Sequence, residues 1–392
     1  MFSKNSYDYY DYNLIAVMIL LVGFGLVMLY STSSYAAGIQ YSNDMYLFRK
    51  QAIFAIISLG VAIGFSMVDY HLLWRISGLI YVGALILMAL TRSPLGMKVN
   101  GARRWIRVGF FSFQPSEAAK IAVIIFIPML IVRMGRHFRG WKALAVPLAA
   151  GGLQALFAYA FTQNLSTALI IMMIAMTIIF IAYPKSWPFL TAAGVVIALT
   201  AILVYCISKG YVNGSFRVTR ILVWLNPEQY PQEGGYQTMQ ALYALGSGGL
   251  FGKGLGNSTQ KLGALPEAYN DMIFSIICEE LGVVGGVIVI MLFIYLIYRL
   301  FFIASNAEDL YGALMVSGIF AHISIQVILN ICVVLNVIPT TGITLPFISY
   351  GGTSVTFLMM EMAIALSVSS RIRFRQTERD LWGEVIDEQN FV

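Results

Sequence analysis

The chain has 392 residues, of which 59% are hydrophobic and only 11% are charged, with a formal net charge of +6. Soluble domains carry roughly 25% charged residues, so this composition excludes an ordinary soluble enzyme, and we expect no nucleic-acid partner. The cysteines at 206, 278 and 332 fall in apolar stretches, where we expect them to pack as small apolar residues.

Apolar stretches of about 20 residues, long enough to cross a bilayer, recur along the whole chain. They predict an all-α, polytopic membrane protein that forms a single domain over residues 1–392. The first stretch is too long for the core of a signal peptide, so we expect a retained anchor. About ten spans are expected, at 13–33, 51–68, 72–91, 117–132, 144–162, 165–183, 188–208, 272–298, 310–335 and 352–370.

Basic residues beside the spans predict the orientation. The loop 133–143 and the short tail 371–392 are rich in arginine, which places them and both termini in the cytoplasm. The 25 Lys and Arg nevertheless divide equally, twelve to each side, with Lys120 inside a span. We interpret the outer face as basic because it meets an anionic ligand such as a pyrophosphate or an acidic lipid. Plain attraction to anionic headgroups and a different topology are the alternatives.

Two outer loops carry this positive charge. In the loop 92–116, Trp105 and Phe110 are expected at the level of the lipid headgroups, while nearby arginines face polar groups. The loop 209–271, before the eighth span, is the longest stretch outside the spans. Its glycine run, 246–256, does not match a nucleotide-binding loop; a backbone nest for phosphate and a tightly packed turn remain alternatives.

Carboxylates near the eighth span mark a candidate site. Glu267 and Asp271 precede the apolar run, and Glu279 and Glu280 lie two turns into it. Carboxylates at membrane depth are costly unless they are paired or used. Partial burial at the outer end of the span predicts a raised pKa for Asp271. The alternative is that this carboxylate caps the N-terminus of the span.

Other polar residues within the spans favour structural roles. Glu117 and Lys120 are three residues apart on one helical face and are expected to pair; a structural ion pair and a role in positioning a lipid remain alternatives. Glu361 is expected to form a hydrogen bond between helices, and His322 to be a satisfied packing residue.

Several separated motifs together resemble the SEDS family (shape, elongation, division and sporulation), which includes FtsW, RodA and SpoVE. The resemblance covers about residues 10–375, and its last motif is closer to the division and sporulation branch than to RodA. The motifs are Asn100–Trp105, Gln114–Glu117 with Lys120, Gly235–Gln237 with Gln240, Gly246–Lys261, Leu265–Asp271 with Glu279–Gly282, and Pro339–Gly352.

This resemblance implies a peptidoglycan glycosyltransferase in the bacterial cytoplasmic membrane. Such enzymes polymerise lipid II, the undecaprenyl-pyrophosphoryl disaccharide-pentapeptide, on the outer face during division, elongation or sporulation. They work beside a class B penicillin-binding protein, a transpeptidase, and other divisome or elongasome membrane proteins. A flippase for lipid II and a non-catalytic scaffold for the penicillin-binding protein are the alternatives.

The resemblance also implies site residues. Asp271 is expected to take or orient the proton of the acceptor hydroxyl, and Glu267 to assist it or to share a divalent cation with it, although no ligand set demands a metal. Substrate contacts are expected from Arg103, Arg104, Glu117, Lys120, Arg217, Arg220, Gln237, Lys261, Glu267 and Ser349.

Two segments depart from the family pattern. Residues 163–167 lack the acid and the glycine that many members have, and Tyr269 with Asn270 replaces a His-Thr pair. Neither departure removes Asp271.

Overall fold

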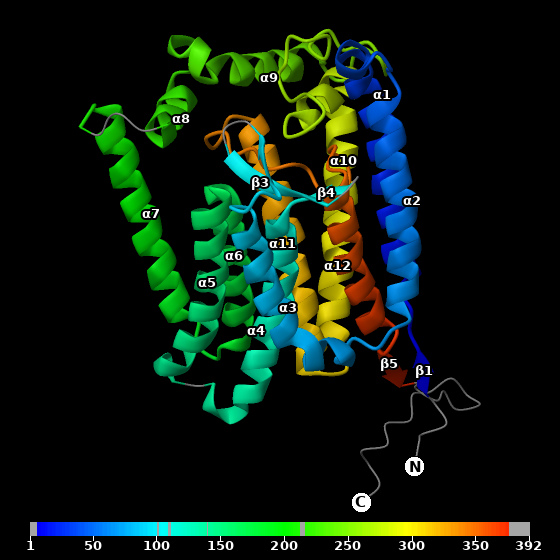
Figure 1. Ribbon diagram of the computed structural model, residues 1–392, viewed down its shortest axis with the longest axis vertical. Helices are drawn as coiled ribbons and strands as arrows, with labels where there is room; N and C mark the ends of the chain where they lie inside the picture. Colours follow the sequence, from blue (N-terminus) through cyan, green and yellow to red (C-terminus); the bar gives the residue numbers. More distant parts are fainter. Residues whose placement is uncertain (1–5, 100–101, 109–110, 139, 212–215, 376–392) are drawn as a thin grey trace, which may run out of the picture.

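The computed structural model describes residues 6–99, 102–108, 111–138, 140–211 and 216–375. Phe110 and the tail beyond residue 375, for which roles are expected above, lie outside the described residues. Within these ranges the protein is a bundle of long, roughly parallel helices (Figure 1). The long helices are α1 (Tyr12–Tyr41), α2 (Tyr46–Ser66), α3 (His71–Leu90), α4 (Pro115–Met134), α5 (Ala145–Thr162), α6 (Leu165–Ala182), α7 (Trp187–Ser208), α10 (Ile273–Asn306), α11 (Leu310–Val334) and α12 (Thr353–Ser369).

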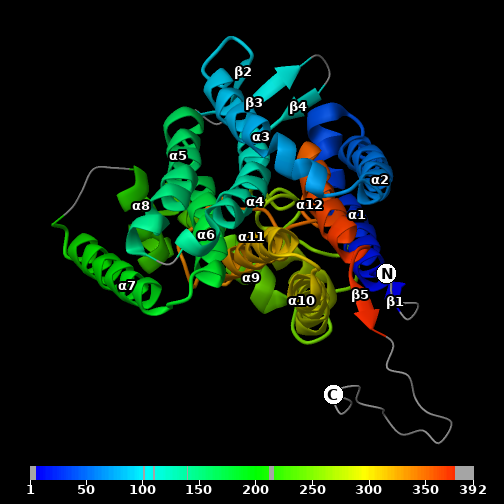
Figure 2. The ribbon, with the colours of Figure 1, turned by 90° about the horizontal axis from the view of Figure 1, so that it is seen from below.

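The expected membrane architecture is confirmed. Among the described residues, nine of these helices are long and apolar enough to cross a bilayer, and α12 is a shorter apolar helix at the position of the tenth expected span. Most of the residues of α4 and α11 are buried, and these helices form the centre of the bundle seen end-on (Figure 2). By contrast, α7 stands at the edge, and Ile207 is its only buried residue within the part of the chain described.

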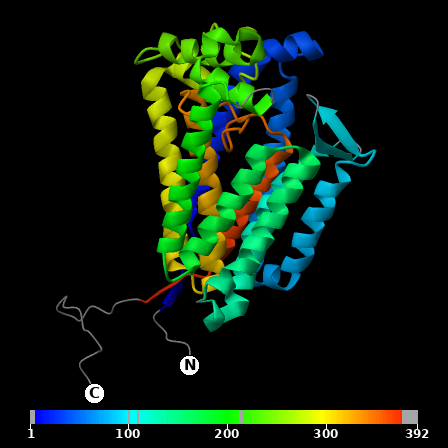
Figure 3. The same cartoon turned by 90° about the vertical axis from the view of Figure 1, so that its left-hand side faces the viewer.

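The segments between the helices hold structure that the sequence did not predict. The loop 92–116 folds into a three-stranded antiparallel sheet of β2 (Gly96–Val99), β3 (Ala102–Val108) and β4 (Phe111–Phe113). The loop 209–271 holds α8 (Phe216–Leu225) and α9 (Gly235–Ser247), which lie across one end of the bundle (Figure 3). Short 3-10 turns occupy Gly135–His137, Trp141–Leu144, Pro227–Gln229 and Pro231–Glu233.

The two ends of the chain meet at the opposite end of the bundle. Strand β1 (Ser6–Asp8) pairs antiparallel with β5 (Arg373–Arg375), so the N- and C-terminal segments lie on the same side, as expected (Figure 1). Beside them Asp11 caps α1 through the amide of Leu14 and forms a buried ion pair with Arg299 of α10. This ion pair fixes the first helix to the tenth at that end.

Hydrogen bonds between polar side chains and neighbouring helices support the packing. Ser58 of α2 bonds to Thr356 of α12 at 2.7 Å, and the Tyr81 hydroxyl of α3 donates to the Ala150 carbonyl of α5 at 2.7 Å. Gln154 of α5 returns a hydrogen bond to the Tyr81 carbonyl. Such bonds between helices are typical of membrane bundles, where apolar contact alone gives little specificity.

The glycine run packs against a break in α10. Gly282 has φ 72° and ψ −172°, which interrupts the helix, and a Cβ at Gly252 would lie 2.2 Å from the Glu280 carbonyl oxygen. The amides of Gly252, Lys253 and Gly254 donate to the carbonyls of residues 248, 279 and 280. Because these amides are occupied by the protein itself, the structure favours the tightly packed turn over a phosphate nest.

We expect Gly252→Ala to destabilise the protein strongly. The left-handed backbone costs about 1–2 kcal/mol for alanine, and the clash with the Glu280 carbonyl adds about 1–3 kcal/mol. Gly256→Ala is the matched control, because its φ is +84° but nothing lies within 4 Å of the added carbon. Thermal unfolding of the purified protein in detergent measures both; equal losses in the two variants would contradict the packed turn.

Candidate active site

The segment between α11 and α12, residues 335–352, forms the floor of the candidate site. It is not helical and lies at the same end of the bundle as α8 and β3 (Figure 1). Side chains of the buried helices hold its backbone: Gln326 donates to the Thr344 carbonyl at 3.0 Å, and Ser166 to the Thr341 carbonyl at 2.9 Å. Ser349 accepts a hydrogen bond from the amide of Leu345, so its hydroxyl stabilises this segment.

Asp271 lies beside this floor, just before α10 begins. The amide of Asn330 on α11 donates to the Asp271 carbonyl at 2.8 Å and to the Ile343 carbonyl at 2.7 Å, which ties the two segments together. The Asp271 side chain is only 9% exposed, and its Oδ1 has no hydrogen-bond partner. A Cβ at Gly342 would lie 3.9 Å from Oδ2, so the glycine leaves room beside the carboxylate.

This carboxylate does not cap the helix. The N-cap residue of α10 is Met272, and no side chain forms a capping hydrogen bond there. The structure therefore gives no support to the capping alternative, and it leaves a buried carboxylate whose Oδ1 accepts no hydrogen bond from the described residues. An unsatisfied buried carboxylate is costly, which is the signature expected of a group retained for chemistry.

The surroundings of Asp271 shift its acidity. Burial, assisted by the negative charge of Glu267, raises the pKa of the Asp271 carboxyl to about 7, while Arg220 acts in the opposite direction. The raised pKa predicted from sequence is thus confirmed. A carboxyl with a pKa near neutrality is a far better general base than an ordinary aspartate.

Two arginines from distant parts of the chain complete the site. Arg220 of α8 donates to the Thr340 carbonyl at 3.0 Å, and burial together with the charge of Arg104 lowers its pKa. Arg104 of β3 is half-buried, and its Nε has no partner, while its terminal nitrogen lies 3.5 Å from the Gln163 carbonyl. Arg104, Arg220 and Asp271 therefore form one electrostatic cluster above the floor, able to meet an anion beside the carboxylate.

The other expected carboxylates form a separate cluster. Glu279 pairs with Lys253 at 2.6 Å, and Glu280 pairs with Lys261 at 2.7 Å, both at the break in α10. Lys261 is buried and also donates to Ser31 of α1. The carboxylates that the sequence suggested as one site thus belong to two separate clusters. Lys261 holds the glycine run in place and does not contact Asp271.

A second polar network lies in the centre of the bundle. Lys120 pairs with Glu117 at 3.0 Å, so the predicted ion pair is confirmed, and it also contacts His322 at 2.9 Å. His322 is fully buried and bonds to Glu361 of α12, which confirms the hydrogen bond between helices expected for Glu361. His322 is satisfied by this bond and by its contact with Lys120, and its packing role stays a prediction. The network reaches the floor through Gln326, which bonds to His322 at 2.8 Å.

The remaining predicted contacts lie around the site. Gln237 of α9 is 3.5 Å from the Pro266 carbonyl, and Glu267 is exposed and bonds to Asn270. Arg103 of β3 donates to the Arg92 carbonyl at 3.3 Å, and Arg217 of α8 lies over the Tyr159 ring. No group of three or more His, Cys, Asp or Glu able to hold a metal occurs among the described residues. The substrate contacts assigned from sequence stay predictions.

Sequence reasoning missed the amides that position the site. Gln326 and Asn330 follow His322 at intervals of four residues, so the three share one face of α11. Polar side chains repeated at helical spacing inside an apolar span predict a face that contacts other protein segments rather than lipid. This spacing could have identified Gln326 and Asn330 from the sequence.

Comparison with known proteins gives concordant matches. The family model of the cell cycle proteins FtsW, RodA and SpoVE matches residues 11–373. Stage V sporulation protein E of Bacillus subtilis is 38% identical over 367 residues, 93% of this chain and 98% of that protein. The probable peptidoglycan glycosyltransferase FtsW of Trichlorobacter lovleyi is 35% identical over 366 residues, 93% of this chain and 94% of that protein.

Solved structures show the same fold. One protein, from a study of the coordination of polymerization and crosslinking by a peptidoglycan synthase complex, superposes with a TM-score of 0.75 at 24% identity, covering 92% of this chain and 97% of that one. The rod shape determining protein RodA of Thermus thermophilus superposes with a TM-score of 0.66 at 25% identity, covering 92% and 96%.

Because the pKa of Asp271 is raised in the folded protein, this residue should lower the free energy of unfolding at neutral and alkaline pH. A carboxyl whose pKa is higher in the folded than in the unfolded state binds more protons when folded, so stability falls as the pH rises between the two values. We expect Asp271→Asn to be more stable than the wild type at pH 8, by up to about 4 kcal/mol.

Thermal unfolding in detergent between pH 4 and pH 8 measures this effect. The difference between the proteins should become small near pH 4, where the carboxyl is protonated in the folded protein and about half protonated in the unfolded chain, since an ordinary aspartate has a pKa of about 3.9. Asp44→Asn is the control, because it makes the same substitution at an exposed aspartate and should change stability much less. A constant difference across the pH range would contradict the raised pKa.

Proposed function

Since the chain belongs to the family of the cell cycle proteins FtsW, RodA and SpoVE, we propose that Asp271 is the catalytic base with which it works as a peptidoglycan glycosyltransferase. Its activity is the polymerisation of glycan strands, in keeping with its FtsW relatives. The substrate is lipid II, a disaccharide-pentapeptide attached to a polyprenyl diphosphate. The observation that carries the assignment is a buried carboxylate with an unpartnered oxygen and a pKa near 7, beside two arginines.

The reaction joins two lipid-linked sugars. The 4-hydroxyl oxygen of the acceptor attacks the anomeric carbon of the donor, forming the new carbon–oxygen bond. The bond from that carbon to the donor's diphosphate breaks, and the lipid diphosphate leaves with the electron pair. Asp271 takes the proton of the attacking hydroxyl. A base whose pKa lies near the working pH contributes typically 10²–10⁴-fold to such a step.

Arg104 and Arg220 are placed to stabilise the departing diphosphate. Negative charge grows on that group as the bond breaks, and fixed cations in a partly buried site stabilise it more than water does. Both side chains are already held by backbone carbonyls, Arg104 by Gln163 and Arg220 by Thr340. Little reorganisation is needed when the substrate binds.

The setting of the enzyme follows from the same proposal. The protein is a multi-pass membrane protein, and we place it in the bacterial cytoplasmic membrane with both termini in the cytoplasm and the Asp271 site on the outer face. A class B penicillin-binding protein is the proposed partner, because polymerisation and cross-linking act on the same strands. A divalent cation at Asp271 and Glu267 would take further oxygen ligands from the substrate diphosphates, as Mg²⁺ does at phosphate sites.

Replacing Asp271 with Asn should abolish polymerisation of lipid II. The variant keeps the shape of the side chain but cannot accept the proton, so we expect the rate to fall at least about 100-fold. The measurement is the yield of glycan strands from purified protein with its penicillin-binding protein, wild type against variant. Strands made by the variant at the wild-type rate would refute the role of Asp271.

The same variant separates the enzyme from a flippase and from a scaffold. A flippase predicts that Asp271→Asn alters lipid II movement across vesicles, whereas the enzyme predicts unchanged movement and no strands. A scaffold predicts that cells complemented with the variant grow normally.

The pH profile of polymerisation should report Asp271. Since the base works only when ionised, kcat/KM should rise with pH through an apparent pKa near 7 and level off above it. Glu267→Gln removes a negative charge that raises this pKa, so its profile should shift to lower pH. An unshifted profile would show that Glu267 does not act on the base.

A further inference from the structure

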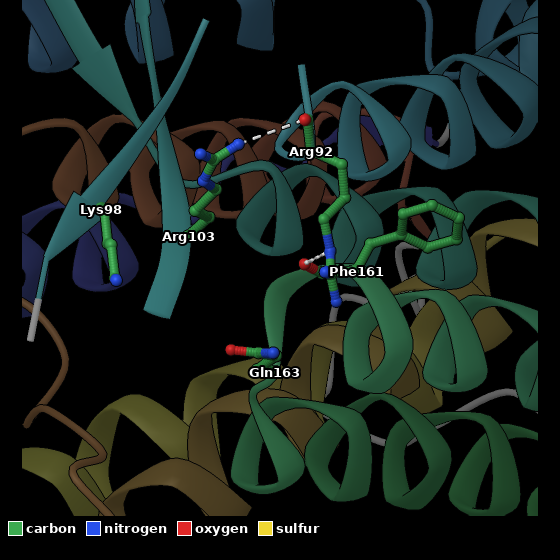
Figure 4. Close-up of a pocket in the computed structure, with 5 residues that line it drawn as sticks. All are labelled: Arg92, Lys98, Arg103, Phe161 and Gln163. Atoms are coloured by element: carbon green, nitrogen blue, oxygen red, sulfur yellow. Dashed lines mark hydrogen bonds between the residues drawn. The ribbon is translucent and has the colours of Figure 1, made fainter. Parts of the chain in front are cut away.

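A basic pocket lies beside the candidate active site, at the edge of the bundle. It consists of two adjoining cavities of about 180 and 400 Å³ that share Arg92 and Gln163. Lys98 and Arg103 line the smaller cavity, and Arg217 lines the larger one. Figure 4 shows Lys98, Arg103 and Arg92 around the smaller cavity, with Gln163 at its other side.

One of these cations has a structural reason to be there. The Arg92 guanidinium donates to the Ala160 and Phe161 carbonyls at 2.7 and 3.2 Å, at the C-terminal end of α5. A cation at that end of a helix satisfies the last carbonyls and the helix dipole. Arg103 in turn donates to the Arg92 carbonyl. Helix capping therefore accounts for Arg92 and for the anchoring of Arg103, and the Tyr159 ring holds Arg217. Neither accounts for Lys98.

The pocket gathers positive charge without neutralising it. Its lining holds four cationic side chains and no carboxylate. Within the part of the chain that the structure describes, the ion pairs involve Lys120, Lys253, Lys261, Arg299, Arg371 and histidines, and none involves these four residues. Phe161 and Tyr159 supply apolar walls, which strengthen the field inside a concave site. Such a site favours a compact anion with more than one negative charge.

The pocket adjoins the reaction centre but does not include it. Neither cavity is lined by Asp271 or Arg220. Gln163 joins the two regions, because its carbonyl accepts from Arg104, whose charge acts on Arg220 beside Asp271. A row of cations thus runs from the pocket to the catalytic carboxylate.

We propose that this pocket binds the diphosphate of the acceptor substrate, the diphosphate that is retained in the reaction. The proposal rests on the function given above, in which both substrates carry a lipid diphosphate. The donor's diphosphate leaves from the reacting carbon, so it must lie beside Asp271. The acceptor's diphosphate is separated from its attacking hydroxyl by the disaccharide, so it needs a second anion site away from the base. The pocket provides that site.

The test is the number of lipid diphosphates that the protein binds. Undecaprenyl diphosphate, which carries no sugar, is added to the full chain in the Asp271→Asn background, and native mass spectrometry counts the bound molecules. We expect two. Lys98→Gln combined with Arg217→Gln should lose one of them, since both residues are exposed and their replacement leaves the fold intact. The matched control is Arg133→Gln with Arg136→Gln, which removes two exposed cations at the opposite end of the bundle.

A second test measures the kinetics of polymerisation with the same double variant in a protein that retains Asp271. The double variant should raise the KM for lipid II about tenfold or more, since one lost charged contact is worth at least that factor, with kcat nearly unchanged. The control pair should change neither quantity.

Three results would overturn the proposal. The first is that the pocket variant retains both lipid diphosphates. The second is that it lowers kcat without raising KM. The third is that phosphatidylglycerol or inorganic pyrophosphate displaces the second molecule as well as undecaprenyl diphosphate does, which would make the pocket a general anion site. None of these results depends on whether Asp271→Asn is inactive. Polymerisation by Asp271→Asn would instead refute the catalytic base, so the two failures are distinguishable.

Discussion

The structure depends on how an apolar bundle neutralises the carboxylates that it buries. Asp11 pairs with Arg299, Glu279 with Lys253, Glu280 with Lys261, and Glu361 with His322. The first and last of these pairs join different long helices, and the other two join the loop before α10 to that helix, so the cost of burying charge is offset by contacts that specify the fold. Among the buried carboxylates of the described residues, Asp271 alone has an oxygen without a hydrogen-bond partner. The other buried carboxylates are stabilised by ion pairs and hydrogen bonds, whereas the proposed catalytic residue is not fully satisfied in this way.

That exception is held in place by neutral groups. Asn330 joins the Asp271 backbone to the segment 335–352, and Gln326 joins the same segment to the buried network of His322 and Lys120. Uncharged amides fix the position of the carboxylate without lowering its pKa, whereas a direct ion pair would hold it ionised and weaken it as a base. Arg220 acts on Asp271 through its charge and forms no hydrogen bond with Oδ1.

The sequence predicted what depends on local pattern. Hydropathy placed the spans, and the motif around Asp271 pointed to the carboxylate that the structure buries beside the segment 335–352, because both are read from neighbouring residues. The partners of Glu279 and Glu280 could not be predicted in this way, since Lys253 and Lys261 reach them only when the glycine run folds against the break at Gly282. The sheet of β2 to β4 was also missed, because a basic, aromatic loop gives no clear alternation. Among the described residues, its short strands pair with one another and with no other strand.

The same sheet explains why the positive charge is divided between two places. Successive residues of a strand point to opposite faces, so Arg103 and Arg104 of β3 diverge. Arg103 lines the pocket with Arg92, whereas Arg104 reaches Gln163 and acts on Arg220. Helix α8 repeats the division, because Arg217 lines the pocket and Arg220 lies near Asp271, three residues further along. Strand β3 and helix α8 therefore each supply one cation to the cluster around Asp271 and one to the pocket. If the two sites bind two diphosphates as proposed, the positions of these two elements fix the separation between the anions.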